Sequence, residues 1–378
     1  MASKIRILHT IKSLGRGGAE MLLPETLRLH DKDLFEFHYI YFLPWKDQMV
    51  DSLQKQGVIV TCFPAGNVVK MMMHLSGLVR YVRQHNIQLI HSHLPWAGIV
   101  SRIVGRICKI PVIYSEHNKQ ERYRAGTRIA HLMSMNLLTE IIAVSNDVAE
   151  SISNHKPNLR VPIRLISNGV NTETFARHHF SGIAVRERLN IPLDVPVVGT
   201  IAVFRVQKRL DAWMEIASKI LQQVNNAHFV IVGDGPLKDD LIRKRNELGL
   251  TKRIHMPGLE TDVRPYLASF NVYMMSSRFE GLPIALLEAM SMECPPVSTN
   301  AGGVGEVIRH GVDGFICPVD ELERLAEYTC RLLEAKELQL TFGLMARQRV
   351  VQEYSIKKMV AELEAIYRRL TTTNTNSR

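Results

Sequence analysis

Two glutamates lie eight residues apart in the segment RFEGLPIALLEAM, residues Arg278–Met290. Glu280 precedes a predicted helix that begins near Pro283, and Glu288 lies inside that helix. A helix N-terminus presents free amides and a partial positive charge, so it attracts an anion such as phosphate. Carboxylates accept hydrogen bonds from vicinal hydroxyls, which a nucleotide sugar has on both its ribose and its hexose. The segment therefore predicts amides that bind a diphosphate and two acids that bind sugar hydroxyls. The alternative is a dipole partner and a solvated helix glutamate.

A basic loop follows another predicted strand in the segment GTIAVFRVQKRLD, residues Gly199–Asp211. Arg205 and Lys208 lie just beyond the carboxyl end of that strand, where positive charge would stabilise a diphosphate leaving group. Arg209 is assigned to solvent. A helix start with scattered surface charges is the alternative for the whole loop.

Two further strand ends are candidates for the same pocket. The strand in FVIVGDGPL ends in a turn that begins at Gly233, which we interpret first as a turn and second as part of a nucleotide pocket. The strand end RIHMPGL contains Met256, and its backbone groups could contact a base edge.

The first half of the chain offers glycines and histidines. A glycine loop with Gly17 and Gly18 follows the first predicted strand, but Glu20 and the lack of an acid closing the second strand depart from the dinucleotide fingerprint. His117 follows a later strand, and we predict a hydroxyl-binding or proton-handling role, with a structural histidine as the alternative. The pair His91-x-His93 has no carboxylate or third ligand nearby in sequence, so we predict no metal site.

Short apolar, β-branched runs alternate with helical patterns along the chain. Such alternation predicts parallel, doubly wound sheets, in which ligands bind at the carboxyl ends of the strands. The first series of predicted strands comprises Ile5–Thr10, Phe37–Leu43, Val58–Phe63, Leu89–Ser92, Val112–Ser115 and Ile141–Val144. The second series comprises Val197–Val203, His228–Val232, Arg253–Pro257, Val272–Met275, Pro296–Thr299 and Phe315–Cys317. Each series fits one Rossmann-like α/β domain.

The domain boundary is predicted within Ser167–Pro196, which contains the turn and proline signals SNGVNTETF and NIPLDVP. We place the first domain at residues 1–177, the second at 178–355, and a final helix and tail at 356–378. The helix carries an apolar stripe that must pack on something, and the tail TTTNTNSR is predicted to be disordered.

The bulk properties are those of a folded two-domain protein of 378 residues. No apolar run reaches the roughly 18 residues that span a bilayer, and the N-terminus reads as a strand, so we expect a cytoplasmic protein without a signal peptide. The five cysteines show no paired or metal-ligand spacing and are predicted to be free thiols.

The positive charge is concentrated in the first half of the chain. Residues 1–190 hold 24 Lys and Arg against 14 Asp and Glu, whereas residues 191–378 hold 23 of each class. Two explanations stay open: peripheral contact with an anionic surface, such as the inner face of a membrane, and a solvated basic face. Nucleic acid is not expected as a partner, because no recognisable nucleic-acid-binding module accompanies the charge.

Several motifs together resemble the retaining family 4 glycosyltransferases of GT-B fold, also called glycosyl transferases group 1. The motifs are GGAE, SNGVNTETF, QKRLD, IVGDGPL, EGLPIALLEAM and AGGVGEVI followed by GVDGFICP, and they extend from the N-terminal glycine loop to Pro318. The resemblance implies two Rossmann-like doubly wound domains facing a cleft, with the final helix crossing back to the first domain. It also implies a metal-independent transferase without a cofactor, whose second domain binds a nucleoside-diphosphate sugar and whose first domain binds the acceptor.

The resemblance assigns roles to individual residues. Glu280 would contact the donor sugar, Glu288 the ribose, and His117 the reacting sugar. The diphosphate would contact Arg205 and Lys208, the Gly17–Gly18 loop, and the backbone of Gly281, Leu282, Pro283 and Ile284. One departure matters, because many family members carry an arginine five residues before the lysine, where this chain has Val203.

The expected activity is transfer of a hexose to the hydroxyl of a glycan, a lipid-linked acceptor or a small molecule, with retention of anomeric configuration. Two alternatives stay open. One is a nucleotide-sugar 2-epimerase of similar architecture, and the other is a catalytically silent partner subunit of a transferase.

Overall fold

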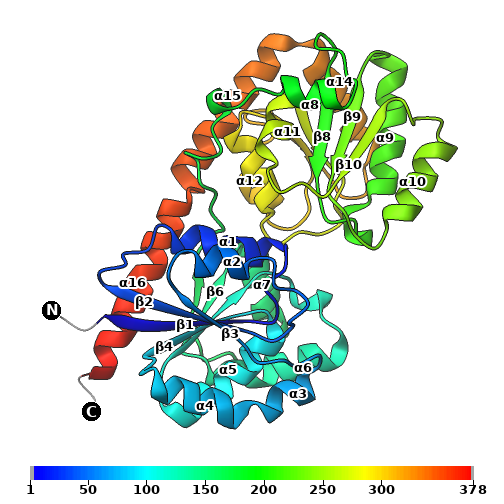
Figure 1. Cartoon of the computed structure of the whole chain (residues 1–378). Coiled ribbons are helices and arrows are strands. Elements are labelled where there is room, and N and C mark those ends of the chain that lie inside the picture. Colours follow the sequence, from blue (N-terminus) through cyan, green and yellow to red (C-terminus); the bar gives the residue numbers. More distant parts are fainter. Residues whose placement is uncertain (1–3, 376–378) are drawn as a thin grey trace. The chain divides into compact units, whose positions relative to one another are not determined.

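The computed structural model describes residues 4–375, and the chain divides into two compact units (Figure 1). Unit 1 comprises Met1–Asn168 and Ile356–Arg378, and unit 2 comprises Gly169–Ser355. The chain therefore passes between the units twice. Near these two points, Val170 and Ser355 form a bridge, and the Val170 amide donates to the Tyr354 carbonyl at 2.9 Å.

Unit 1 contains a parallel sheet in the order β3-β2-β1-β4-β5-β6-β7. Its strands are β1 (Ile5–Ile11), β2 (Phe35–Tyr41), β3 (Ile59–Cys62), β4 (Leu89–His93), β5 (Val112–Glu116), β6 (Glu140–Ala143) and β7 (Ile163–Leu165). Six of these strands overlap the predicted first series, whereas β7 was not predicted. Two of its three residues are exposed and it carries Arg164, so it lacks the apolar run by which the other strands were found.

Helices cover both faces of this sheet. They are α1 (Gly18–Leu27), α2 (Val50–Gln54), α3 (Val68–Met73), α4 (Leu75–Gln84), α5 (Pro95–Cys108), α6 (Ala125–Ser134), α7 (Asn146–His155) and α16 (Ile356–Thr375), with 3-10 turns at Gln120–Arg122 and Met135–Leu137. Figure 1 shows α3, α4, α5 and α6 together on the face opposite α1 and α2.

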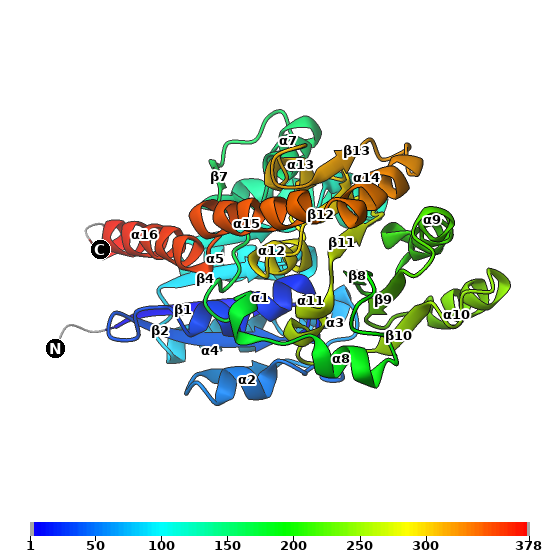
Figure 2. The ribbon, with the colours of Figure 1, turned by 90° about the horizontal axis from the view of Figure 1, so that it is seen from above.

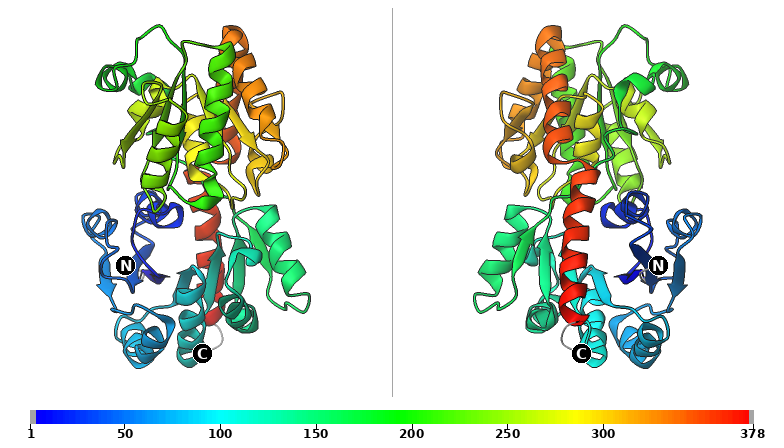
Figure 3. Two further views of the ribbon diagram at one scale, coloured as in Figure 1. Left: turned by 90° about the vertical axis from the view of Figure 1, so that its right-hand side faces the viewer. Right: turned by 90° about the vertical axis from the view of Figure 1, so that its left-hand side faces the viewer.

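The C-terminal helix α16 belongs to unit 1, as predicted, although the intervening unit separates it in sequence. Figure 3 shows it, in red, along the sheet of that unit, where it contacts α1 and β4. Leu363, Ile366 and Tyr367 from its apolar stripe lie in the core that β1, β2 and β4 form. The predicted disordered tail is wrong for residues 371–375, which continue α16, and its residues 376–378 lie outside the described part of the chain.

Unit 2 contains a parallel sheet in the order β10-β9-β8-β11-β12-β13. Its strands are β8 (Val197–Ile201), β9 (His228–Val232), β10 (Ile254–Gly258), β11 (Val272–Met275), β12 (Pro296–Thr299) and β13 (Phe315–Cys317). All six were predicted, four of them with the observed bounds.

The helices of unit 2 again cover both sheet faces. They are α8 (Ile183–Arg188), α9 (Leu210–Gln223), α10 (Lys238–Glu247), α11 (Arg264–Ser269), α12 (Ile284–Ser291), α13 (Val304–Val307), α14 (Glu323–Glu334) and α15 (Lys336–Glu353), with 3-10 turns at Arg177–His179 and Val206–Lys208. Figure 2 shows α9 and α10 beside β9 and β10 at one side of the unit. Trp213 on α9 is fully buried and donates its indole N–H to the Met274 carbonyl at 2.9 Å, which fastens α9 to β11.

Candidate active site

Two loops lock together at the carboxyl ends of β8 and β11, which are neighbours in the sheet of unit 2. The Arg278 amide donates to the Gln207 carbonyl at 2.8 Å. The Ser276 hydroxyl donates to the carbonyls of Lys208 and Arg209 at 2.8 and 2.9 Å. These bonds join the two loops directly. The basic segment after β8 and the acidic segment after β11 are therefore held next to each other.

The Arg209 side chain also connects these loops by hydrogen bonds. Its guanidinium donates to the carbonyls of Ser276 and Val319 at 2.7 and 2.9 Å, and its backbone adopts a left-handed conformation with φ 47°. Arg209 is half-buried, so its assignment to solvent is wrong. The sequence alone did not distinguish this arginine from its neighbours. An arginine can connect two loops only where backbone carbonyls of both lie within reach of its guanidinium, and the sequence does not show where that occurs.

The Lys208 ammonium lies 2.6 Å from the Glu280 carboxylate oxygen Oε1. The Glu280 residue is 8% exposed, so the pair is largely shielded from solvent. An ammonium carries three N–H donors and a carboxylate has two oxygens, so each partner keeps capacity for a ligand. Arg205, three residues earlier, is exposed and forms no ion pair with any described residue.

The segment between the two acids starts helix α12. Pro283 has extended backbone at the N-cap, and the Gly281 carbonyl accepts from the Gly303 amide at 2.8 Å. The first amides of a helix have no partner within it, so they face outward at this end. Pro283 was predicted as part of the backbone that binds the diphosphate. It has no N–H and therefore cannot donate a hydrogen bond to the diphosphate. Glu288 is 8% exposed within α12.

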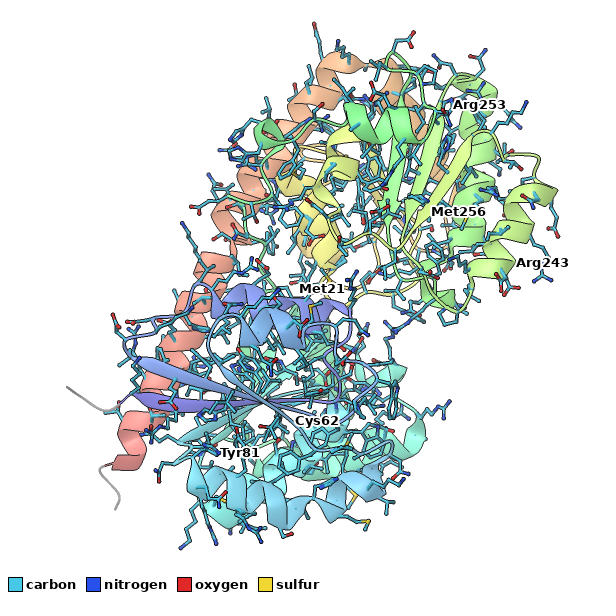
Figure 4. The ribbon with its side chains drawn as sticks, in the orientation of Figure 1. Met21, Cys62, Tyr81, Arg243, Arg253 and Met256 are labelled. Carbon is cyan, nitrogen blue, oxygen red and sulfur yellow. The ribbon has the colours of Figure 1, made fainter. Side chains whose placement is uncertain are left out.

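The glycine turn after β9 is packed against the loop after β8. Gly233 has φ +138°, and a β-carbon there would come within 1.9 Å of the Ala202 carbonyl oxygen. Its amide donates to the Gly258 carbonyl at the end of β10, at 2.8 Å. Met256 lies on β10, two residues before Gly258, and is half-buried (Figure 4). Glycine is therefore required at position 233 for packing, whatever the turn binds.

His117 follows β5 in unit 1 and is half-buried. Its ring nitrogen Nε2 lies 3.4 Å from Nδ1 of His93 at the end of β4, the neighbouring strand. Burial lowers the pKa of His117 to about 4, an effect that the nearby Glu116 carboxylate only partly opposes. His117 is therefore neutral at physiological pH, which favours hydroxyl binding over proton transfer between its charged and neutral forms.

The loop that carries His117 is fixed by the fully buried carboxylate of Glu116. This carboxylate accepts from the amides of His117 and Asn118 at 3.1 and 3.3 Å. It also accepts from the side chains of Gln120 and Tyr123 and is within 3.1 Å of His131 Nε2. Sequence reasoning did not single out Glu116, although an acid at the end of an apolar strand was an available signal.

His9 joins His91 and His93, and one ring nitrogen of each lies within 4.8 Å of the other two. The sequence could not supply this third histidine, because it comes from β1, which pairs with β4 in the register His9↔His91. The nitrogens of His91 bond to the hydroxyls of Tyr367 and Ser115 at 2.6 and 2.7 Å. His9 and His93 share a hydrogen bond of 3.1 Å. Five of the six ring nitrogens of the cluster thus have hydrogen-bond partners, and only Nε2 of His9 has none among the described residues.

The Gly17–Gly18 loop forms the start of α1, with Gly17 as the N-cap. Glu20 folds back over it, since a β-carbon at Gly17 would lie 2.3 Å from its carboxylate oxygen Oε2. The Ser13 hydroxyl donates to the other oxygen of Glu20 at 3.0 Å. The helix start therefore already has a carboxylate beside it, which would have to move or share a donor if a phosphate bound there.

Two family models match the chain. The model described as Glycosyltransferase Family 4 matches residues 16–174, and the model described as Glycosyl transferases group 1 matches residues 195–335. The chain belongs to glycosyltransferase family 4. The predicted family is confirmed, and this glycosyltransferase matches it in both units.

Relatives of known function span most of the glycosyltransferase. It is 24% identical over 377 residues to the UDP-Gal:alpha-D-GlcNAc-diphosphoundecaprenol alpha-1,3-galactosyltransferase of Escherichia coli, with 97% of each chain covered. It is 25% identical over 307 residues to the N-acetyl-alpha-D-glucosaminyl L-malate synthase of Bacillus anthracis, with 77% of each covered.

The fold is that of GT-B glycosyltransferases, as predicted. The structure of Anabaena HepE in complex with UDP and glucose superposes with a TM-score of 0.84 at 20% identity, covering 96% of this chain and 99% of HepE. None of the described helices combines the length and the apolar composition that a bilayer crossing requires.

Proposed function

We propose that this glycosyltransferase transfers a hexose from a nucleoside-diphosphate sugar to an acceptor hydroxyl with retention of anomeric configuration. The proposal is supported by the family membership and by relatives whose names include a UDP-galactose-dependent transferase. The acceptor class that fits best is a glycan or a lipid-linked sugar. Relatives that act on such acceptors include the diphosphoundecaprenol-dependent enzyme.

The observation that carries the proposal is the Lys208–Glu280 pair at the start of α12. We assign two remaining N–H groups of Lys208, the exposed Arg205 guanidinium and the first amides of α12 to the diphosphate. In this proposal the backbone of Gly281–Ile284 lies next to the diphosphate. We assign Oε2 of Glu280 to a hydroxyl of the donor sugar, because Oε1 is held by Lys208.

The chemical step consists of one displacement on one face of the sugar. The bond from the anomeric carbon to the β-phosphate oxygen breaks, and the acceptor oxygen bonds to the same carbon from the same face. The proton of the acceptor hydroxyl passes to the departing diphosphate oxygen. Lys208 and Arg205 stabilise the negative charge that develops on that oxygen, which is the largest single contribution of such sites to catalysis. In this proposal the step uses no protein nucleophile, metal or cofactor.

The other assigned residues complete the donor site. Glu288 binds the ribose hydroxyls, and the β9 and β10 ends at Gly233 and Met256 contact the base. His117 contacts the reacting sugar, and the Gly17–Gly18 loop contacts the donor phosphate. The family resemblance is the basis for each of these roles.

A direct experiment incubates the protein with a panel of nucleoside-diphosphate sugars, with and without a lipid-linked or glycan acceptor. We expect an acceptor-dependent glycoside whose anomeric configuration, measured by NMR, equals that of the donor. Inversion would refute retention. Conversion of the sugar nucleotide without acceptor would identify an epimerase, and failure to stabilise the fold with any donor would support a silent partner subunit.

We also propose that one face of unit 1 contacts an anionic membrane. From Ser52 to Ser115 the sequence has no Asp or Glu but seven Lys or Arg residues. The helices α3, α4, α5 and α6 lie on one face of the sheet (Figure 1). They expose large apolar side chains. These side chains are Val69, Met73, Ile107, Ile129 and Met133.

Basic side chains are interspersed with those apolar groups. Lys70, Arg80, Arg83, Arg106 and Arg124 are all exposed. A groove on the same face combines Arg80 and Arg83 with Val79 and Ile107. Exposed apolar side chains interspersed with cations fit the interface of an anionic lipid layer, where a lipid-linked acceptor would be found.

A further inference from the structure

A row of three histidine rings ends at His117. Nδ1 of His9 on β1 lies 3.1 Å from Nε2 of His93 on β4, and Nδ1 of His93 lies 3.4 Å from Nε2 of His117 after β5. The His9 and His93 rings stack with their planes 10° apart, and the His93 and His117 rings with theirs 29° apart. Because β1, β4 and β5 are successive neighbours in the sheet, their register produces this row.

All three rings are neutral near pH 7. Burial lowers the pKa of His9 to about 3 and that of His117 to about 4, and burial with the neighbouring charges of His9 and His117 holds the pKa of His93 well below its ordinary value. A neutral imidazole has one N–H donor and one bare acceptor nitrogen. The row can therefore run in only two directions, with every N–H pointing toward His117 or every N–H pointing away from it.

The far end of the row decides between these directions. Nε2 of His9 is buried and has no hydrogen-bond partner among the described side chains, and the His9 ring stacks on Tyr39 at 5.0 Å. If the N–H groups pointed away from His117, this nitrogen would carry a buried proton without an acceptor. Buried N–H groups without acceptors are rarer in folded proteins than buried acceptors without donors. A bare Nε2 on His9 is therefore the favoured state.

His30, which also lies in this core, supports that choice. Its Nδ1 lies 3.0 Å from the carboxylate of Glu364, which can only accept, so its proton is on Nδ1. Burial lowers the pKa of His30, which keeps the ring neutral, and its Nε2 is likewise buried and without a partner. A bare, buried Nε2 is thus already imposed at a second histidine of the same unit.

We propose that His93, supported by His9, is a positioning residue that fixes His117 as the tautomer protonated on Nδ1. His93 donates from Nδ1 to Nε2 of His117, so Nε2 is occupied and Nδ1–H is the only polar group that the ring can offer. No described residue accepts from that N–H, and His117 is half-buried, not fully enclosed. His117 therefore donates a hydrogen bond to an oxygen of its ligand and does not take a proton from the acceptor hydroxyl.

The identity of that ligand oxygen rests on the proposed function, in which it belongs to the reacting sugar. The tautomer itself does not depend on it. Side-chain ¹H–¹⁵N correlation spectra of the ligand-free, ¹⁵N-histidine-labelled full chain at pH 7 test it directly. His117 is assigned by the signals that the His117→Asn variant loses. We expect protonated Nδ1 and bare Nε2 in His9, His93 and His117, and a protonated Nε2 on His117 would overturn the proposal.

Two substitutions at His93 separate hydrogen bonding from packing. His93→Phe fills the space without a donor, so the His117 signals should change to a mixture of tautomers. His93→Asn retains an N–H donor at the same number of bonds from the backbone as Nδ1, so the Nδ1 tautomer should return. His91→Phe is the control, because His91 is equally buried but bonds to Tyr367 and Ser115 instead. It should leave the His117 signals unchanged. Unchanged signals in a folded His93→Phe variant would contradict the inference.

Activity provides a second readout. His93→Phe should lower kcat/KM for the sugar-nucleotide donor about tenfold, the usual effect of one lost hydrogen bond, and His93→Asn should restore most of it. Equal loss in both variants, at equal thermal stability, would indicate packing alone and would overturn the positioning role. If the protein used no sugar nucleotide, the proposed function would fail while the spectra still tested the tautomer.

Discussion

Lys208 and Glu280, 72 residues apart in the chain, form an ion pair of 2.6 Å because the loops after β8 and β11 are hydrogen-bonded to each other. Each residue holds the other in place before any ligand binds. A lysine ordered in this way can meet a diphosphate without losing further side-chain freedom, which is the main advantage of a preorganised site.

Replacing Lys208 with alanine should reduce kcat about a hundredfold, equivalent to about 3 kcal/mol in the barrier, because the leaving diphosphate loses its nearest cation. The variant should still fold, but its thermal midpoint should fall, because the shielded Glu280 carboxylate loses its partner. Steady-state kinetics with the preferred donor measures the effect. The matched control is Lys244→Ala, which breaks an ion pair with Glu215 on the surface of the same unit and should retain activity. Near-normal turnover in the Lys208 variant would refute the assigned role.

Replacing Glu288 with alanine should weaken binding of the free nucleoside diphosphate about tenfold, because the ribose hydroxyls lose a charged acceptor. Titration calorimetry with the nucleotide alone isolates this contribution from the hexose. Glu288→Gln should give a smaller loss, since an amide oxygen still accepts. The exposed Glu247 at the end of α10 serves as the control, and equal affinities in the Glu288 and Glu247 alanine variants would be incompatible with a ribose contact.

Gly233→Ala should destabilise unit 2 by about 1–3 kcal/mol or more, because φ +138° is strained for alanine and the new methyl would meet the Ala202 carbonyl at 1.9 Å. Gly126→Ala is the control, since Gly126 has nothing within 4 Å of an added β-carbon and lies in the first turn of α6. That change should be neutral or stabilise by about 0.4–1 kcal/mol. Urea unfolding measures both, and equal stability of the two variants would contradict the close packing.

The buried histidines should make unit 1 sensitive to acid. The folded-state pKa values of His9 and His117 are about 3 and about 4, below the value of 6.5 in an unfolded chain. The unfolded state therefore binds more protons between these values, so stability is fully present above pH 6.5 and falls as the pH is lowered. Each histidine should contribute a slope of about 1.4 kcal/mol per pH unit.

Urea unfolding between pH 7 and pH 5, followed by NMR signals of unit 1, measures this slope. His117→Asn removes one of the titrating groups and should reduce the slope. The control is His178→Asn, the same change at an exposed position of unit 2, which leaves unit 1 unaltered. A slope that is the same in all three proteins would show that His117 titrates alike in the folded and unfolded states.

Vesicles test the proposed membrane face. Co-sedimentation should be detectable with vesicles that contain anionic lipid, should fall with added salt, and should be absent with neutral lipid. The double variant Met73→Asp and Met133→Asp should lose binding, because both side chains are about three-quarters exposed and would now repel the surface. Leu344→Asp, an equally simple change at an exposed position of unit 2, is the control. Binding that the double variant retains would rule out this face.

The sequence alone determined the fold class and twelve of the strands. Runs such as His228–Val232 and Val272–Met275 are apolar and β-branched because strands of a parallel sheet are buried on both faces, and this requirement is local enough to be visible in the residues. The β7 strand was missed because it is short and largely exposed. The family was also evident from short motifs such as EGLPIALLEAM, in which glycine, proline and acids keep a fixed spacing.

Only the tertiary structure decided which residues share an environment. Arg209 fastens two loops instead of facing solvent, because carbonyls of Ser276 and Val319 converge on it from two other strand ends. His9 joins His93 and His117 through strand register, which no spacing along the chain reveals. Residue type and local spacing indicate which side chains each helix or strand must bury. Hydrogen-bond partners and proton positions depend instead on which helices and strands become neighbours in the fold.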